Sequence, residues 1–415
     1  MKIVLLIDCY EPSIGGVITS VKSLKESLTL LGHEVYIITL DAVPKQKETD
    51  PNVIRLNGGI PLLFKGLKDY RLLLNYKKHL QKLKELNLDI IHIHTEAGVG
   101  HLGIFAAQEL NLPLIYTMHS MYHIFLEKNN FFWIKLLKKI LLHSLDRILH
   151  KFISASDFII VPTEKTLLFL QNSYSQNKKY EIIPTGLKLQ NFDSQKYSLE
   201  EINILKNKLN LTNFFICLFV GRLSKEKDIN LIIDNFAFFH EQNKKSKFVI
   251  IGDGPEKKSL QKKVKKLNLQ DKIIFLGFVP NDQTGLYYQL GDVFLNASLF
   301  ETQGLTFIEA LSASLPVVAR YDEALKGVVE HGKNGFFYQN EKEFVQILNN
   351  LISNKTKYKE ISLQAKESIK DYKQEVFGAK MIDIYKKAIE ENKRSIIESY
   401  ETEKDRETQK ELKNS

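Results

Sequence analysis

Residues 292–310 read Asp-Val-Phe-Leu-Asn-Ala-Ser-Leu-Phe-Glu-Thr-Gln-Gly-Leu-Thr-Phe-Ile-Glu-Ala, and this stretch indicates how the chain folds. It begins with a short apolar strand at residues 293–295, passes through a polar turn and continues as a helix over about 305–314. A buried strand that leads through a glycine turn into a helix is typical of a parallel α/β sheet. The turn carries Glu301 and Gly304, and the helix carries Glu309.

The start of this helix is a candidate site for a phosphate. Its first backbone N–H groups have no partner within the helix, and the helix dipole favours negative charge there. Glu301 and Glu309 would repel a phosphate, so they suit the neutral hydroxyl groups of a sugar or a ribose. The alternative interpretation is an ordinary helix cap followed by an exposed glutamate.

The same alternation of apolar strands and helices extends over most of the chain. A polar, helical stretch at 193–212 separates two such series and predicts a linker. We therefore predict an α/β fold of two doubly wound, Rossmann-like parallel-sheet domains, residues 1–200 and 201–375, that face a cleft. Residues 376–415 are expected to form a helix that returns to the first domain and ends in a charged tail.

Length, cysteine content and hydropathy limit the class of protein. The 415 residues suit two domains, and Cys9 and Cys217 are far apart in apolar strands, which predicts buried thiols in a reducing compartment. The chain opens with a strand in place of a signal peptide, and no apolar run is long enough to span a membrane. These features predict a cytoplasmic protein.

The net charge of +9 comes from two segments, residues 61–84 and 131–151, which hold twelve basic and two acidic residues. Both are predicted to be basic amphipathic helices, and the second begins beside Trp133. Such helices suit an anionic lipid surface, whereas their aliphatic runs have no role against nucleic acid. The alternative is that the apolar stripes pack on the first sheet and the lysines are only solvated. The predicted membrane-binding residues are Lys65, Lys68, Arg71, Lys77, Lys78, Lys82, Lys84 and Trp133.

A second loop at the carboxyl end of a predicted strand carries two cations. Arg222 and Lys227 follow the strand at 215–220, and Gly252-Asp-Gly follows the next strand. Two cations and one helix N-terminus that meet at one edge form a diphosphate site. A solvated surface loop is the alternative, and the glycine turn alone is a weak signal.

Three motifs together carry a family resemblance. They are Gly-Arg-Leu-x-x-x-Lys at 221–227, Ile-Gly-Asp-Gly-Pro at 251–255 and Glu-Thr-Gln-Gly-Leu-Thr-x-x-Glu-Ala at 301–310. Their sequences and spacing resemble the retaining glycosyltransferases of family 4, which have the two-domain GT-B fold. The resemblance implies a nucleotide-sugar donor whose diphosphate contacts Arg222 and Lys227. It further implies ribose contacts from Glu309, sugar contacts from Glu301 as a catalytic residue, and backbone amides of Gly304 and Leu305 against the phosphate.

The first domain extends the resemblance. Gly16 ends a loop that resembles the family's glycine loop, which approaches the donor phosphate and the acceptor. The alternative is a loop glycine that serves backbone geometry alone. His119 follows a predicted strand and aligns with the family's active-site histidine, which contacts the donor sugar. The segment from His94 to Glu96 is interpreted as cleft wall. No Asp-x-Asp triplet occurs, which predicts a site without metal, and the nucleotide sugar is a substrate, so no cofactor is expected.

Within the family, the chain most resembles diacylglycerol glucosyltransferases, through stretches that include 92–96, 287–289, 294–298 and 320–322. This similarity implies transfer of α-glucose from UDP-glucose to the 3-hydroxyl of 1,2-diacylglycerol by a peripheral protein on the cytoplasmic face of the membrane. The alternatives are galactose as the sugar, or a glycosylated lipid, a polyprenyl-linked or a soluble acceptor. An alternative of another class is an idle membrane-surface adaptor. No carboxylate nucleophile is assigned, because the family's usual account is attack on the face that the phosphate leaves.

Overall fold

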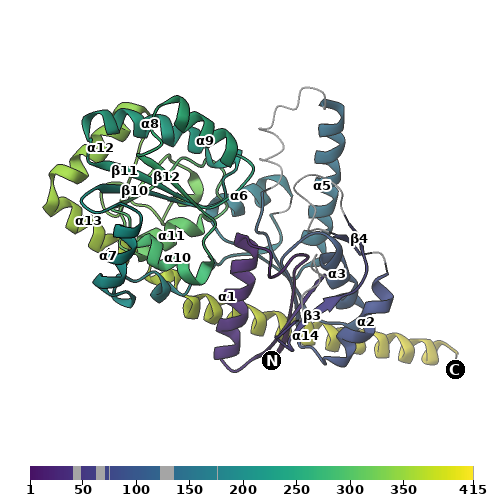
Figure 1. The fold of residues 1–415 in the computed structure, drawn as a ribbon. Helices are drawn as coiled ribbons and strands as arrows, with labels where there is room; N and C mark the ends of the chain where they lie inside the picture. Colours follow the sequence, from purple (N-terminus) through teal and green to yellow (C-terminus); the bar gives the residue numbers. More distant parts are fainter. Residues whose placement is uncertain (41–47, 62–70, 74, 122–134, 175, 415) are drawn as a thin grey trace. The chain divides into compact units, whose positions relative to one another are not determined.

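The computed structural model describes residues 1–40, 48–61, 71–73, 75–121, 135–174 and 176–414. The chain forms two compact units: unit 1 contains 1–186 and 375–415, and unit 2 contains 187–374 (Figure 1). The sequence placed the first boundary after residue 200. In the structure unit 2 begins earlier, because Leu187, Leu189 and Phe192 are buried in its hydrophobic core.

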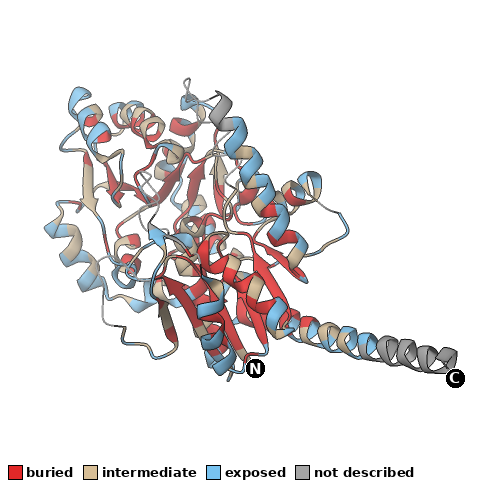
Figure 2. Ribbon diagram, turned by 90° about the vertical axis from the view of Figure 1, so that its right-hand side faces the viewer, coloured by how far each residue is buried: buried red, intermediate tan, exposed pale blue. Residues whose placement is uncertain are grey.

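Unit 1 is built on a seven-stranded sheet in the order β3-β2-β1-β6-β7-β8-β9, and all neighbouring strands are parallel. The central strands β1, β6, β7 and β8 are almost completely buried (Figure 2), whereas the edge strand β9 has no buried residue. Their bounds are β1 Lys2–Leu6, β2 Glu34–Leu40, β3 Val53–Leu56, β6 Ile90–Ile93, β7 Leu114–Thr117, β8 Phe158–Val161 and β9 Lys179–Ile182.

Helices cover both faces of this sheet because side chains alternate along each strand. Val4 and Leu6 of β1 share one core with α2, α3, α5 and α6, whereas Ile3 and Leu5 share the other with α1 and α14. Helix α14 contributes Tyr385 to that second core. The bounds are α1 Gly16–Leu30, α2 Tyr76–Glu85, α3 Gly98–Leu110, α5 Lys135–Ala155, α6 Glu164–Ser173 and α14 Gln374–Asn414.

Unit 2 has a six-stranded parallel sheet in the order β12-β11-β10-β13-β14-β15. Leu218 of β10 faces one core and Phe219 the other, so this unit is also doubly wound and the predicted fold class is confirmed. The strands are β10 Phe215–Val220, β11 Ser246–Ile251, β12 Ile273–Gly277, β13 Val293–Asn296, β14 Val317–Ala319 and β15 Gly335–Phe337. The helices are α7 Leu199–Lys208, α8 Ile229–Gln242, α9 Lys257–Lys266, α10 Asn281–Tyr288, α11 Leu305–Ser312, α12 Glu341–Ser353 and α13 Lys355–Ser368.

The predicted helix over 61–85 is wrong in its first part. Strands β4, Ile60–Pro61, and β5, Arg71–Leu72, form an antiparallel pair there, and residues 62–70 lie outside the described residues. Helix α2 starts only after Asn75, whose side chain accepts a hydrogen bond from Lys78 N at 3.3 Å and so caps the helix. Among the described residues, no helix is both long and apolar enough to cross a membrane.

Candidate active site

The carboxyl edge of the unit 2 sheet gathers the donor-binding residues that were predicted in this unit, whereas Gly16 lies in unit 1. The loop after β10 carries Arg222 and Lys227, the loop after β13 carries Glu301 and Gly304, and Arg320 follows β14. Parallel strands all end at the same edge, so residues from separate parts of the sequence meet there. Arg222 is exposed at this edge.

Two glycines allow the loops after β10 and β11 to touch. Gly252 has a φ of +135°, and a Cβ atom on it would lie 1.9 Å from the carbonyl oxygen of Gly221. A Cβ on Gly254 would lie 2.4 Å from the carbonyl oxygen of Leu223. Any side chain at either position would push the loop of Arg222 away. The glycine turn, a weak signal in sequence, therefore positions the cationic loop.

Lys227 and Glu301 form an ion pair between the loops after β10 and β13. Lys227 Nζ donates to Glu301 Oε1 at 2.6 Å, and the side chains are 21% and 8% exposed. The pair joins the predicted diphosphate ligand to the predicted sugar ligand. A largely buried carboxylate needs such a partner, because burial removes the water that would otherwise stabilise its charge.

Helix α11 begins at the glycine turn that the sequence indicated. Gly304 occupies the N-cap with a φ of +79°, and a Cβ on it would lie 2.8 Å from Cδ2 of Phe307. Leu305 is the first residue of the helix. The backbone amides of this first turn are therefore the natural donors for an anion at the same edge.

Glu309, further along α11, accepts a hydrogen bond from the hydroxyl of Tyr288 at 2.7 Å. Burial raises the pKa of Glu309 to about 7, and the hydrogen bond from Tyr288 opposes that rise. Tyr288 itself is fully buried at the end of α10, with its ring 5.6 Å from that of Phe192. Sequence reasoning did not assign Tyr288 a role, because only the packing of α10 against α11 brings it to Glu309.

A second polar contact at this edge was also missed. Arg320, directly after β14, lies 3.4 Å from a carboxylate oxygen of Asp228, directly after Lys227. Asp228 has a left-handed backbone with a φ of 45°. No local pattern relates these residues, which are 92 positions apart.

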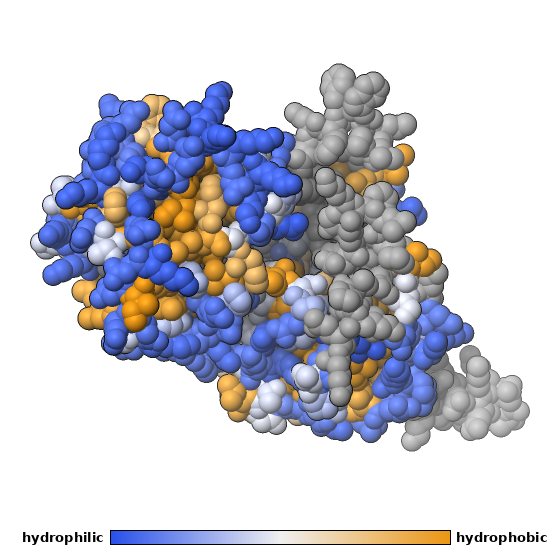
Figure 3. Space-filling view, in the orientation of Figure 1, coloured by the Kyte–Doolittle hydropathy of each residue, from blue (hydrophilic) through white to orange (hydrophobic). Residues whose placement is uncertain are grey.

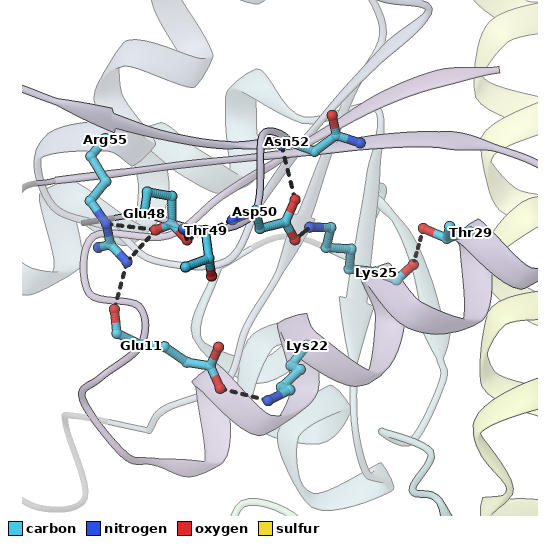
Figure 4. A network of polar contacts seen from close by, with 9 residues as sticks. All are labelled: Glu11, Lys22, Lys25, Thr29, Glu48, Thr49, Asp50, Asn52 and Arg55. Atoms are coloured by element: carbon cyan, nitrogen blue, oxygen red, sulfur yellow. Dashed lines mark hydrogen bonds and ion pairs between the residues drawn. The ribbon is translucent and has the colours of Figure 1, made fainter. Parts of the chain in front are cut away.

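In unit 1, a polar network holds the loop that leads to Gly16 (Figure 4). Arg55 on β3 donates to the carbonyl of Glu11 at 2.6 Å, and Lys22 on α1 binds the Glu11 carboxylate at 2.6 Å. Glu48 binds the same arginine at 2.8 Å. The loop is therefore tied to a strand and a helix on either side. A Cβ atom on Gly15 would meet nothing within 4 Å, so packing alone does not demand a glycine there.

His119 lies beside two further histidines at the carboxyl edge of the unit 1 sheet. His94 Nδ1 lies 3.0 Å from His119 Nε2, and the rings of His92 and His94 are 4.0 Å apart. Burial lowers the pKa of His119 to about 4 and the pKa values of His92 and His94 well below the ordinary value. All three are therefore neutral at pH 7, as groups that hydrogen-bond and do not carry charge.

The carboxylate of Asp8 caps helix α3, which follows the segment after His94. The buried carboxylate of Asp8 accepts hydrogen bonds from Val99 N at 2.9 Å, Ala97 N at 3.2 Å and the Thr95 hydroxyl at 2.5 Å. Glu96 accepts from the Tyr116 hydroxyl at 2.5 Å, and burial raises the pKa of Glu96 to about 7. These contacts fix the conformation of residues 94–96; their role as a cleft wall stays a prediction.

The predicted membrane-binding residues divide into described and undescribed ones. Helix α2 packs Leu80 and Leu83 into the core of unit 1 and exposes its lysines Lys77, Lys78, Lys82 and Lys84. The apolar stripe of this helix is therefore core, as the alternative interpretation held. Arg71 lies on β5, whereas Lys65, Lys68 and Trp133 fall outside the described residues.

The burial of apolar side chains differs between the two ends of helix α5. Leu149 and Phe152 are buried in the core, but Ile140 and Leu141 nearer its start are 57% and 46% exposed. Figure 3 shows small hydrophobic areas near α5 and larger ones on unit 2. Helix α5 therefore exposes two apolar side chains, Ile140 and Leu141, that a partner could contact.

Comparison with known proteins agrees with the motifs. The family model of group 1 glycosyl transferases matches residues 201–368, and that of glycosyltransferase family 4 matches residues 14–191. The chain is 38% identical to the alpha-monoglucosyldiacylglycerol synthase of Acholeplasma laidlawii, over 95% of this chain and 99% of that protein. It is 31% identical to the synthase of the same name from Streptococcus pneumoniae, over 94% and 87% respectively. The structure of Anabaena HepE in complex with UDP-glucose has a TM-score of 0.72 at 18% identity, over 93% of this chain and all of that one.

Proposed function

The chain belongs to glycosyltransferase family 4 and has the GT-B fold, and from this premise we propose the reaction that it catalyses. The enzyme transfers α-glucose from UDP-glucose to the 3-hydroxyl of 1,2-diacylglycerol, with retention of configuration. The observation that carries the proposal is the 38% identity to a monoglucosyldiacylglycerol synthase across nearly the full length of both chains. The ion pair of Lys227 with Glu301 supports it, since it combines a phosphate ligand with a hydroxyl ligand at one edge.

The proposed chemical step breaks one bond at the anomeric carbon and forms another. The bond from the anomeric carbon of glucose to the β-phosphate oxygen breaks, and UDP leaves with the electron pair. The 3-hydroxyl oxygen of diacylglycerol forms the new bond on the face that UDP leaves, and its proton passes to the departing phosphate oxygen. Retention thus needs no carboxylate nucleophile, in contrast to retaining glycosidases.

The residues of unit 2 supply what this step requires. Negative charge builds up on the leaving diphosphate, and Arg222, Lys227 and the first turn of α11 lie at the edge where it would bind. Glu301 is held to accept hydrogen bonds from the transferred sugar, and Glu309 from the ribose. This set of charges stabilises the leaving group without a metal ion.

The acceptor is a lipid, so we propose that the enzyme works as a peripheral protein at the cytoplasmic membrane surface. The exposed lysines of α2 attract anionic headgroups, each with about 1 kcal/mol near the surface. Ile140 and Leu141 on α5 provide apolar contact. In this proposal the lysines of α2 attract the protein to the anionic membrane, and the apolar side chains of α5 insert into it.

UDP release tests the proposal directly. Purified protein is mixed with UDP-glucose, with and without diacylglycerol in anionic vesicles, and UDP-galactose serves as the matched donor. Release that depends on both UDP-glucose and diacylglycerol, with an α-linked glucolipid as product, is the expected result. Release with UDP-galactose or with a glycosylated lipid alone would change the substrate assignment. No release with any donor would favour an idle adaptor.

A further inference from the structure

We propose that His94 is a positioning residue that holds His119 in the tautomer with the proton on Nδ1. His119 then presents an N–H donor, and not an acceptor or a base, at its other ring nitrogen. The inference deepens the proposed function and rests on it, with His119 as the sugar-contacting histidine that the family resemblance implies. It comes from one cluster in unit 1 that connects β6, β7 and α14.

His92 supports the histidine cluster, because its own ring is fixed by two hydrogen bonds. Its Nδ1 lies 2.7 Å from the hydroxyl of Tyr385 on α14, and its Nε2 lies 2.7 Å from the hydroxyl of Thr117 on β7. Both ring nitrogens are thus engaged, so His92 is fixed in its place. The ring of His94 lies against it with centroids 4.0 Å apart. His94 is 2% exposed, and its backbone N–H donates to Leu6 O at 2.9 Å.

The contact of His94 with His119 permits two proton arrangements. Both rings are neutral, because burial lowers both pKa values, and one nitrogen must donate while the other accepts. Either His94 Nδ1–H donates to His119 Nε2, or His119 Nε2–H donates to His94 Nδ1 across the same 3.0 Å. If His94 donates, His119 carries an N–H donor at Nδ1; if His119 donates, its Nδ1 is a lone-pair acceptor.

The far nitrogen of His94 decides between them. Its Nε2 is buried and has no hydrogen-bond partner in the described part of the chain. If His119 donated, the proton of His94 would sit on this Nε2, as a buried N–H without an acceptor. If His94 donates through Nδ1, only a lone pair is buried there. Orphaned buried N–H groups are the rarer and costlier case, so the arrangement in which His94 Nδ1–H donates to His119 Nε2 prevails.

This assignment gives His119 a definite chemical role. A neutral Nδ1–H can donate to a hydroxyl oxygen of the sugar, but it cannot remove a proton from the acceptor. His119 therefore binds and orients the donor sugar, and the proton of the acceptor must go elsewhere. The orientation depends on His94, which need not touch the substrate.

The test is the proton position on His119, read by ¹⁵N NMR of histidine-labelled protein. Asparagine can place its amide N–H where His94 Nδ1–H lies, whereas leucine fills a similar space without a donor. We expect the Nδ1–H tautomer of His119 in the parent and in His94→Asn, and its loss in His94→Leu. Turnover should fall about tenfold in His94→Leu, through kcat more than through KM, and recover largely in His94→Asn.

The outcomes separate this inference from the proposed function. An Nε2–H tautomer of His119 in the parent overturns the inference, even if neither variant folds. An unchanged tautomer and unchanged kcat in a folded His94→Leu would also overturn it. If the parent shows Nδ1–H but transfers no glucose to diacylglycerol, the tautomer stands and the proposed reaction fails. Thermal unfolding of each variant confirms that the comparison is between folded proteins.

Discussion

Burial of Glu309, which raises its pKa to about 7, is expected to make donor binding depend on pH. If Glu309 binds the ribose as a carboxylate, protonation removes an acceptor and weakens the complex. The pKa of Glu309 is about 7, so affinity for UDP-glucose should fall as the pH falls through that value. At pH 6 roughly one molecule in ten carries the ionised group, which weakens apparent affinity about tenfold relative to the plateau at high pH.

The change Tyr288→Phe sharpens the prediction. It removes the hydroxyl that stabilises the ionised carboxylate at 2.7 Å and keeps the buried ring. A hydrogen bond to a charged group contributes about 1.5–3 kcal/mol, so the pKa of Glu309 should rise by roughly one to two pH units. At pH 7.5 the variant should bind UDP-glucose roughly 3- to 25-fold more weakly than the parent, and the difference should shrink as the pH rises.

The assay is calorimetric titration with UDP-glucose between pH 6 and 8.5. UDP-glucose is the better probe because UDP has a terminal phosphate that itself titrates near pH 6. Glu309→Gln is the control, since an amide does not titrate and its affinity should be low and flat. A flat profile for the parent, or identical profiles for the parent and Tyr288→Phe, would refute ribose binding by an ionised Glu309.

Three further predictions concern charge. Lys227→Met should lower turnover about 10²- to 10³-fold and destabilise the fold by about 1–3 kcal/mol, since Glu301 is largely buried. Lys357→Met, which breaks an exposed pair with Glu360, should alter neither rate nor thermal unfolding measurably. Turnover of dialysed protein should persist in excess EDTA, and a loss that magnesium restores would contradict a metal-free site. Neutralising the four exposed lysines of α2 should reduce sedimentation with phosphatidylglycerol vesicles. The reduction should be largest at low salt, because at 0.1 M the Debye length is only about 10 Å and charges farther apart are screened. Neutralising four exposed lysines of α9 is the matched control. The set on α2 is Lys77, Lys78, Lys82 and Lys84, and the set on α9 is Lys258, Lys262, Lys265 and Lys266.

The sheet architecture was largely predictable because it depends on local patterns. Apolar runs such as 215–220 and 248–251 have no alternation, which indicates strands buried on both faces. Only the first part of the helix predicted from residue 61 was wrong, because periodicity does not reveal a strand pair or the cap at Asn75. Strand β3 also escaped notice, since only two of its four residues are buried.

The position of the candidate residues at strand ends was predictable from the sequence, but their contacts were not. The glycine turn before α11 and the cations after β10 are local signals at strand ends. The pairing of Lys227 with Glu301 spans 74 positions, and that of Tyr288 with Glu309 spans 21. Such distances depend on how the strands are ordered and how the helices pack, which residue patterns do not specify. The partners that set charge and pKa therefore emerged only from the structure.

The two units provide different electrostatic environments, and the proposed reaction needs both. Unit 2 carries cations where the leaving diphosphate gains negative charge. Unit 1 provides His119, whose pKa of about 4 keeps it neutral at pH 7. The sugar ring gains positive charge as its bond to phosphate breaks, so an imidazolium beside it would raise the barrier. If His119 contacts the sugar as proposed, its burial avoids that charge, and the proposed Nδ1–H tautomer supplies a hydrogen-bond donor that does not repel the oxocarbenium-like transition state.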